Sequence, residues 1–166
     1  MELNILKAIE TLQNPIFDKI SIFMAQLGTG GAIFILIGLL FLMFKQTRKL
    51  GANILISLVL SGLLGNLFLK PLINRVRPYN AVGRAILVKP LKDGSFPSGH
   101  TYSAFATAFS ALYYNKKLGV GLLGFAALMG FTRLYLFVHY PTDVLGGVAL
   151  GYVCAIMAKK ISDKFI

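Results

Sequence analysis

The chain has 166 residues, of which 56% are hydrophobic and only 14% are charged. Its mean hydropathy of +0.71 excludes an ordinary soluble protein, and the charged residues lie between uncharged stretches, a pattern typical of a helical membrane protein with several spans. The chain has 17 Lys and Arg against 6 Asp and Glu, but these basic residues sit at the ends of apolar runs. This placement argues against nucleic acid as the partner and favours anionic lipid headgroups or an anionic substrate.

Residues 1–13 form a short amphipathic segment ahead of the apolar runs. Apolar side chains recur there at helical spacing, opposite charged ones: Leu3, Leu6, Ile9 and Leu12 against Glu2, Lys7 and Glu10. We expect a helix that lies in the membrane interface, with an ordinary packing helix of a soluble protein as the alternative.

The next helix begins at Asn14-Pro15, because Asn is a favoured N-cap and Pro is a favoured first helical residue. The segment over 15–27 contains both Asp18 and Lys19. We therefore expect it to be a short span or to lie partly in the interface, and its sequence leaves open whether it crosses the membrane fully.

Further apolar segments follow a glycine-rich break, GTGG, at 28–31. The segment over 51–69 has no charged residue and matches the thickness of the hydrocarbon layer. The others lie at 32–44, 98–114, 118–138 and 142–159. Together they predict one all-α domain over 1–166: a polytopic membrane helical bundle with five or six transmembrane helices, plus an N-terminal interfacial helix over 1–13.

Basic residues between the apolar segments indicate the orientation. Three clusters fall on one side when the spans are counted: Lys45, Arg48 and Lys49; Lys116 and Lys117; and Lys159, Lys160 and Lys164. The positive-inside rule makes this side cytoplasmic. The polar region over 70–97 and the turn around His139 then lie at the outer face. The 70–97 region is itself basic, and we interpret its charges as functional.

The first of three polar groups at this outer face is KPLINRVRP, in which Lys70 and Arg77 are seven residues apart. Seven residues make nearly two helical turns, so the two cations share a face if the helix continues through this stretch. Basic residues that reach from a span end toward the headgroups are the alternative.

The second group is PSGH, over 97–100. A helix that starts here directs the free N–H groups of Ser98 and Gly99 outward, and such a helix start is an anion-binding site. The alternative is that Ser98 only caps the helix and that His100 is an interfacial polar residue.

The third group contains Arg133, His139 and Asp143. Arg133 lies within an apolar stretch, where an unpaired charge costs roughly 3 kcal/mol, and arginine suits the planar grip on a phosphate. Asp143, four residues after His139, is able to hold that imidazole in one tautomer, which leaves its other nitrogen free to attack. A buried Arg133–Asp143 ion pair beside an uninvolved His139 is the alternative.

Taken together, the three groups supply cations, two histidines, one carboxylate and a helix start. They contain no acidic cluster suited to Mg²⁺ or Ca²⁺, and two histidines with one aspartate are a thin set for zinc, so we expect no metal and no other cofactor. Cations around a nucleophilic histidine imply phosphoryl transfer, in which one histidine attacks phosphorus and the other protonates the leaving oxygen.

The three motifs resemble the signature of the type 2 phosphatidic acid phosphatase family: Lys70-x6-Arg77-Pro78, Pro97-Ser98-Gly99-His100 and Thr132-Arg133-x5-His139-x3-Asp143. The resemblance covers about residues 28–158. It implies that His139 is the nucleophile, that Asp143 orients His139 and that His100 is the general acid. It further implies that phosphate is bound by Lys70, Arg77, Arg133, Ser98 and Gly99. The family usually has Ser where this chain has Thr132; the hydroxyl is kept, and the extra methyl group is expected to tighten the pocket.

The resemblance also implies six membrane helices and a metal-independent active site at the outer face. We therefore expect a membrane lipid phosphatase of the bacterial cytoplasmic (inner) membrane whose site faces the periplasm or the exterior. Its partners are then the bilayer and a lipid phosphate or diphosphate: undecaprenyl diphosphate, phosphatidylglycerophosphate or the 1-phosphate of lipid A. Three cations of the outer region either read a second phosphate or attract anionic lipid: Arg84, Lys89 and Lys92.

Two other classes of function compete with hydrolysis. A lipid-headgroup transporter or flippase would use Arg133 and Asp143 for binding without chemistry, but it needs no nucleophilic histidine. A non-catalytic scaffold would explain the basic helix ends and leave the buried Arg133 without a reason.

Overall fold

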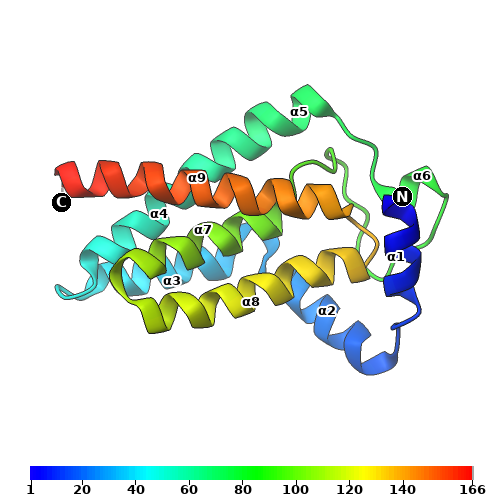
Figure 1. The fold of residues 1–166 in the computed structure, drawn as a ribbon, viewed down its shortest axis with the longest axis horizontal. Coiled ribbons are helices and arrows are strands. Elements are labelled where there is room, and N and C mark those ends of the chain that lie inside the picture. The colour runs from blue at the N-terminus through cyan, green and yellow to red at the C-terminus, as the bar shows by residue number, and fades with distance from the viewer. Residues whose placement is uncertain (166) are drawn as a thin grey trace.

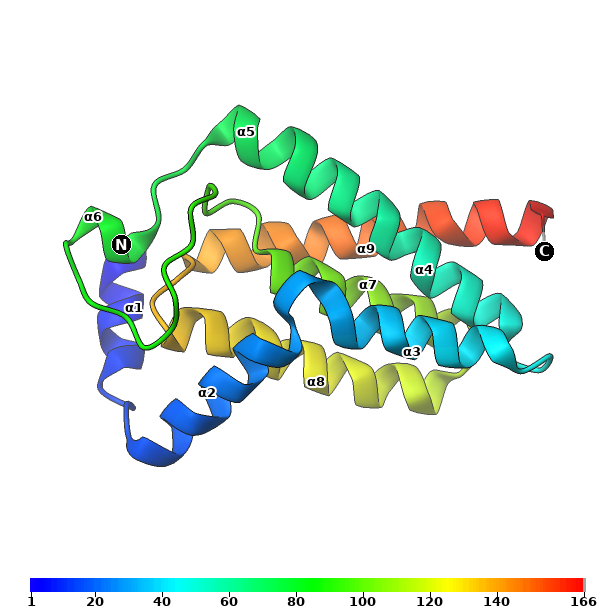
Figure 2. The same ribbon diagram turned by 180° about the vertical axis from the view of Figure 1, so that it is seen from behind.

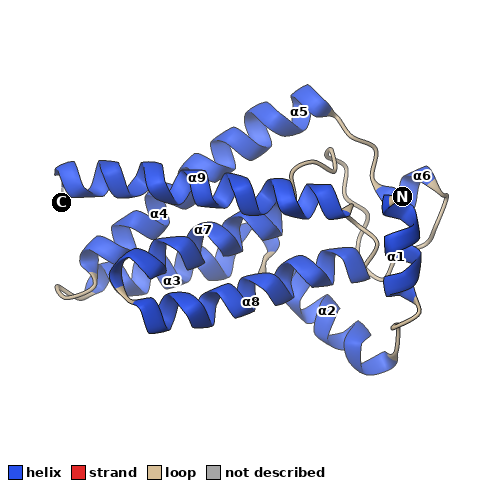
Figure 3. Cartoon of the chain, viewed as in Figure 1, coloured by secondary structure: helices blue, strands red, loops and turns tan. Residues whose placement is uncertain are grey.

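The computed structural model describes residues 1–165, and within that range the chain is all helix, turn and loop, without a strand (Figure 3). The expected all-α class is confirmed. The helices are α1 Glu2–Glu10, α2 Pro15–Leu27, α3 Ala32–Met43, α4 Arg48–Gly62, α5 Lys70–Ile73, α6 Pro78–Ala81, α7 Gly99–Tyr114, α8 Lys116–Tyr135 and α9 Pro141–Phe165. A 3₁₀ turn, Thr29–Gly31, joins α2 to α3, and a π-helical stretch, Leu63–Leu69, joins α4 to α5.

Helix α7 lies in the middle of the bundle and packs against α4, α8 and α9. The long helices run lengthwise, and the C-terminus, the α3–α4 connection and the α7–α8 turn share one end (Figures 1 and 2). The opposite end carries α6, the loop that leads to α7 and the α8–α9 turn, with α1 lying across it. The three basic clusters and the three motifs thus occupy opposite ends of the bundle.

Small residues let the helices approach closely. A Cβ atom on Gly51 would lie 2.4 Å from the backbone nitrogen of Leu42, and one on Gly151 would lie 2.8 Å from the carbonyl oxygen of Tyr102. Hydroxyl groups also join helices, since Ser57 Oγ of α4 and Ser110 Oγ of α7 are 3.2 Å apart. Contacts of this kind are characteristic of helix packing in lipid, where burial of apolar area between helices gives little driving force.

The six apolar segments expected from the sequence all form helices, although the one over 118–138 stops being helical after Tyr135. Among residues 1–165, three stretches are long and apolar enough to cross a membrane: Arg48–Ala81, which includes the non-helical residues 74–77, Lys116–Tyr135 and Pro141–Lys164. Helices α2 and α3 meet at a bend of 49°, and they make a fourth span if the bent pair is counted as one. Asn14 caps α2 as predicted, its side chain accepting hydrogen bonds from the backbone N–H groups of Ile16 and Phe17. The number of five or six spans stays a prediction.

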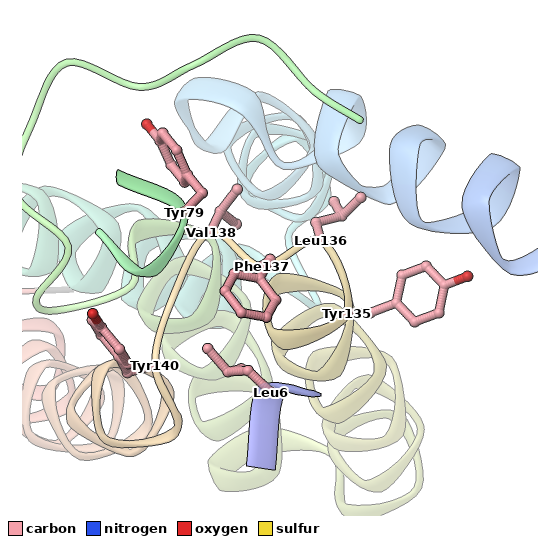
Figure 4. Packing of buried hydrophobic residues seen from close by; sticks show 7 residues of the cluster. All are labelled: Leu6, Tyr79, Tyr135, Leu136, Phe137, Val138 and Tyr140. Atoms are coloured by element: carbon pink, nitrogen blue, oxygen red, sulfur yellow. The ribbon is translucent and has the colours of Figure 1, made fainter. Parts of the chain in front are cut away.

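The N-terminal helix α1 packs on protein at the end of the bundle. Its Leu6 is fully buried against residues of α6 and the α8–α9 turn, among them Tyr79, Phe137 and Tyr140 (Figure 4). Ile5 and Leu12 of the same segment stay 42% and 52% exposed, which leaves an apolar edge for the membrane interface.

Candidate active site

His139 lies in the short turn between α8 and α9 and is only 2% exposed. Phe137, two residues earlier, has a φ of 60°, and its buried side chain in the Leu6 cluster holds this left-handed turn in place. His139 Nε2 lies 3.2 Å from Arg77 Nη1, while Nδ1 faces Ser95 Oγ at 3.5 Å and Asp143 Oδ2 at 3.6 Å.

These contacts define the tautomer of His139. A guanidinium only donates hydrogen bonds, so Nε2 beside Arg77 is the unprotonated nitrogen and the proton sits on Nδ1, on the side of Asp143. Burial, assisted by the neighbouring Arg77 cation, lowers the pKa of His139 to about 4, despite the opposing carboxylate. His139 is therefore neutral at pH 7, with a lone pair on Nε2, which is the form that a nucleophile requires.

Asp143, in the first turn of α9, is completely buried and fully hydrogen-bonded. Its Oδ2 accepts from the Tyr140 N–H at 2.8 Å and from the Ser95 hydroxyl, and its Oδ1 accepts from Arg75 Nη1 at 2.6 Å. The alternative of an Arg133–Asp143 ion pair is thus wrong, since the arginine that Asp143 binds is Arg75.

Lys70 and Arg77 meet at a carboxylate, and they do not share a helix face as expected. Helix α5 ends at Ile73 because Asn74 turns left-handed, with a φ of 41°. The two cations are brought together by Asp93, whose Oδ2 binds Lys70 Nζ and whose Oδ1 lies 2.8 Å from Arg77 Nη2. Burial by itself raises the pKa of Asp93, but the hydrogen bond and charge of Lys70, with the charge of Arg77, lower it to about 2.

The start of α7 differs from the expected helix N-terminus in one respect. Ser98 is the N-cap residue, but its N–H is not free, because it donates to the carbonyl oxygen of Asp143 at 3.0 Å. The Ser98 side chain makes no capping bond and accepts from Thr101 Oγ1 at 2.9 Å. Plain capping is therefore wrong too. Ser98 is fully buried, whereas Gly99 and His100 line the cavity described below.

His100 faces the glycine-rich bend between α2 and α3. Its Nε2 lies 2.9 Å from the carbonyl oxygen of Ala25, and since a carbonyl only accepts, this nitrogen carries a proton. A Cβ atom on Gly28 would lie 2.3 Å from the His100 ring. Gly28 thus provides space for the imidazole, a reason for this glycine that spacing alone did not reveal.

Arg133 is 2% exposed, and within residues 1–165 it donates hydrogen bonds to neutral groups alone. Its Nη2 donates to the Ser21 carbonyl at 3.4 Å and to Thr132 Oγ1 at 3.1 Å. The Thr132 hydroxyl, the one departure from the family pattern, thus holds Arg133. The guanidinium does not line the cavity below, and a buried cation held only by neutral oxygens favours an anion close by.

One cavity of about 650 Å³ joins most of these side chains. Its polar end is formed by Lys70, Arg77, Asp93, Gly99, His100 and His139. From there it continues along apolar side chains of α3, α4 and the π-helical stretch: Ile35, Leu55, Leu58, Val59 and Leu63. Because Val59 is 61% exposed on the outside of the bundle, this apolar wall borders the surface that lipid would cover.

Two residues of the site were missed from the sequence, Asp93 and Ser95, and Arg75 was included only among the functional charges of the 70–97 region, without a role of its own. Arg75 stands between the two cations of the first motif, and Asp93 and Ser95 stand just before the second. Their proximity to the motifs was the available signal. Arg84, in contrast, pairs with Glu10 at 2.6 Å and lies over the Phe137 ring, while Lys89 and Lys92 are exposed. Among residues 1–165, no group of three or more His, Cys, Asp or Glu side chains is arranged to hold a metal.

Comparison with known proteins finds a matching family model and similar chains. A family model described as the PAP2 superfamily matches residues 50–166. Undecaprenyl-diphosphatase BcrC of Bacillus subtilis is 31% identical, over 98% of this chain and 85% of the relative. Phosphatidylglycerophosphatase B of the same organism is 32% identical, over 95% and 81%.

Two solved structures are similar over nearly the whole chain. Aquifex aeolicus LpxE has a TM-score of 0.82 and 29% identity, covering 96% of this chain and 94% of that one. The transmembrane PAP2-type phosphatidylglycerolphosphate phosphatase of Bacillus subtilis has a TM-score of 0.78 and 29% identity, covering 98% and 85%.

Proposed function

The chain belongs to the PAP2 superfamily and is a membrane lipid phosphatase, and we propose that it works through a phosphohistidine formed on His139. The observation that carries this proposal is the shared cavity, which has His139, His100 and two cations at one end and an apolar wall at the other. A lipid phosphate combines the same two chemistries, a charged head and an apolar tail.

In the first step, the Nε2 lone pair of His139 attacks phosphorus and forms a P–N bond. The P–O bond to the lipid breaks, and the departing oxygen takes a proton from His100, which enters this step as an imidazolium beside the anionic phosphate and leaves it as a neutral imidazole. The developing imidazolium is stabilised by Asp143, which lies on the Nδ1 side. In the second step, His100 accepts a proton from water, the water oxygen attacks phosphorus, and the P–N bond breaks. Inorganic phosphate leaves with His139 again neutral.

Phosphate oxygens are held by Lys70, Arg77 and Arg133 and by the backbone of Gly99. Ser98 is buried beneath this helix start and stabilises it through its hydrogen bond to the Asp143 carbonyl. Lys70, Arg77 and Gly99 already line the cavity. Arg133 has only neutral partners, so an anion near Thr132 would satisfy its charge. Because charge spreads over the equatorial oxygens in phosphoryl transfer, cations that are fixed beforehand supply most of the catalysis.

We propose a prenyl diphosphate as the favoured substrate class. The relatives named undecaprenyl-diphosphatase support this, since one of them matches 98% of the chain at 31% identity. Relatives and structures named for phosphatidylglycerophosphate and lipid A phosphate make these two lipids the comparators. The apolar wall along α3 and α4 would accommodate the first part of the tail.

We also propose that the protein lies in a bacterial cytoplasmic membrane with this site at the outer face. The α3–α4 connection, the α7–α8 turn and the C-terminal part of α9, which carry the three basic clusters, lie at one end of the bundle, and α6 and the α8–α9 turn lie at the other (Figures 1 and 2), in agreement with the positive-inside rule. Labelling of single cysteines placed in the 79–96 loop of intact cells tests this orientation.

The proposal is tested by release of inorganic phosphate from the three lipids in detergent, with EDTA present. We expect turnover without added metal, inhibition by vanadate, and loss of activity in His139→Ala. Lys159→Gln, which changes an exposed ion pair at the opposite end of α9, is the control. Full activity in His139→Ala would refute the nucleophile, and binding of lipid without phosphate release would favour a headgroup transporter.

A further inference from the structure

We infer that Glu2, at the start of α1, is a positioning residue for the proposed reaction and holds Arg75 against Asp143. This inference rests on the proposed function, because it assigns a role toward the proposed nucleophile. Glu2 touches neither the cavity nor His139, and it lies outside the region that the superfamily model matches. Its effect is transmitted through a chain of contacts that reaches Nδ1 of His139.

The series of contacts begins at the Glu2 carboxylate. Its Oε1 accepts hydrogen bonds from the Thr142 N–H at 3.0 Å and from the Thr142 hydroxyl at 2.7 Å, and its Oε2 pairs with Arg75 Nη2. Thr142 stands in the first turn of α9, where free N–H groups favour a negative charge. Although burial opposes it, these hydrogen bonds lower the pKa of Glu2, so the carboxylate is charged at neutral pH.

Arg75 links Glu2 to the buried Asp143. Its Nη1 donates to Thr142 Oγ1 at 2.7 Å and to Asp143 Oδ1 at 2.6 Å, while its guanidinium lies over the ring of Tyr140 at 4.0 Å. The side chain is 27% exposed, so it has space to turn toward solvent if it is released. Glu2 is the partner that fixes the half of the guanidinium that faces away from Asp143.

Asp143 divides its two oxygens between this arginine and the nucleophile. Oδ1 binds Arg75, and Oδ2 faces Ser95, the Tyr140 N–H and His139 Nδ1. The carboxylate is completely buried, so removal of Arg75 leaves Oδ1 without its charged partner and frees the group to rotate. A rotated carboxylate no longer holds the proton of His139 on Nδ1, and this reduces the availability of Nε2.

The position of α1 makes Glu2 available for this contact. The buried Leu6 attaches the helix to the turn that carries His139, as Figure 4 shows. At the other end of the helix, Glu10 pairs with Arg84 at 2.6 Å. This second ion pair resembles the first in kind, but it has no contact with Asp143. Glu10 is therefore a matched control within the same helix.

The test compares phosphate release by the wild type, Glu2→Gln, Glu10→Gln, Arg75→Gln and the double variant Glu2→Gln/Arg75→Gln. Glutamine keeps an oxygen for Thr142 but removes the charge that holds Arg75. We expect kcat to fall about tenfold in Glu2→Gln and up to about 100-fold in Arg75→Gln, as for displaced catalytic groups, with KM within about twofold. Glu10→Gln should stay within about twofold of the wild type in both constants.

The double variant identifies the route. If Glu2 acts through Arg75, the double variant has the kcat of Arg75→Gln within about twofold, whereas independent effects multiply. Equal kcat values for Glu2→Gln and Glu10→Gln, or multiplied losses in the double variant, overturn the inference and leave the proposed function intact. The Glu2–Glu10 comparison does not depend on correct folding of Arg75→Gln. A wild-type protein that releases no phosphate overturns the proposed function and this inference with it.

Discussion

Replacement of Asp93 by Asn is expected to lower KM for a lipid phosphate while kcat stays unchanged. The Asp93 carboxylate binds both Lys70 and Arg77, the cations to which we assign the phosphate. An incoming phosphate therefore has to replace a carboxylate that already neutralises them. Asparagine keeps the shape of the side chain and one acceptor oxygen but removes the charge.

The size of this effect follows from the exposure of the carboxylate. The Asp93 side chain is 47% exposed, so solvent screens its ion pairs, and each contributes about 0.5–1 kcal/mol. Two such pairs oppose phosphate binding by about 1–2 kcal/mol, which corresponds to a decrease in KM of roughly 5- to 30-fold in Asp93→Asn.

The assay measures the initial rate of phosphate release against lipid phosphate concentration in mixed micelles. Asp163→Asn, which removes the exposed partner of Lys159, serves as the control. Because the pKa of Asp93 is lowered to about 2, the carboxylate stays charged down to mildly acidic pH, and the KM difference should be the same at pH 5 and pH 8. A KM that rises, or a kcat that falls at constant KM, would show that Asp93 serves to align Lys70 and Arg77 and does not compete with substrate.

Three further predictions concern the two histidines. Gly28→Ala should lower kcat because the new methyl group displaces the His100 ring. Gly121→Ala, whose methyl group meets no neighbour, should leave kcat unchanged, and equal kcat values for the two variants would refute the role of the Gly28–His100 contact. His100→Ala should slow substrates with poor leaving groups far more than activated aryl phosphates, and an equal loss for both would remove its role as the acid. On the acid side, kcat/KM should begin to decrease only well below pH 6.5, because the pKa of His139 is lowered to about 4 and the inactivating proton binds only there. A decrease centred near pH 6.5 would contradict the buried environment of His139.

The sequence was sufficient to predict the helices and the meeting point of the motifs. Apolar runs and the Asn14 cap mark helices directly, and counting of spans placed Lys70, Gly99 and His139 at one end of the bundle. This prediction succeeded because each membrane-spanning helix must end at one of the two membrane faces. Residues that are far apart in the sequence but lie at helix ends on the same face are therefore brought close together.

The sequence was insufficient where contacts depend on loop geometry. Asp93, Ser95 and Glu2 lie in segments whose polar residues have no periodicity to reveal which way they face. The break at Asn74 went unnoticed because a single left-handed residue leaves no pattern, and it was this break that separated Lys70 and Arg77 from a common helix face. The free N–H expected at Ser98 was lost to the Asp143 carbonyl, a contact between distant segments that local capping rules do not include.

The burial of His139 has a stereochemical consequence. Its Nδ1 side is occupied by Ser95 and Asp143 and its turn is covered by the cluster around Leu6, so Nε2 is reached only through the cavity. In the proposed mechanism the lipid leaving group, a prenyl monophosphate for a diphosphate substrate, therefore has to depart before a water molecule takes its place, and both displacements occur at Nε2 of the imidazole. Each in-line displacement inverts phosphorus, so a substrate made chiral with oxygen isotopes and sulfur should give a product with its original handedness retained.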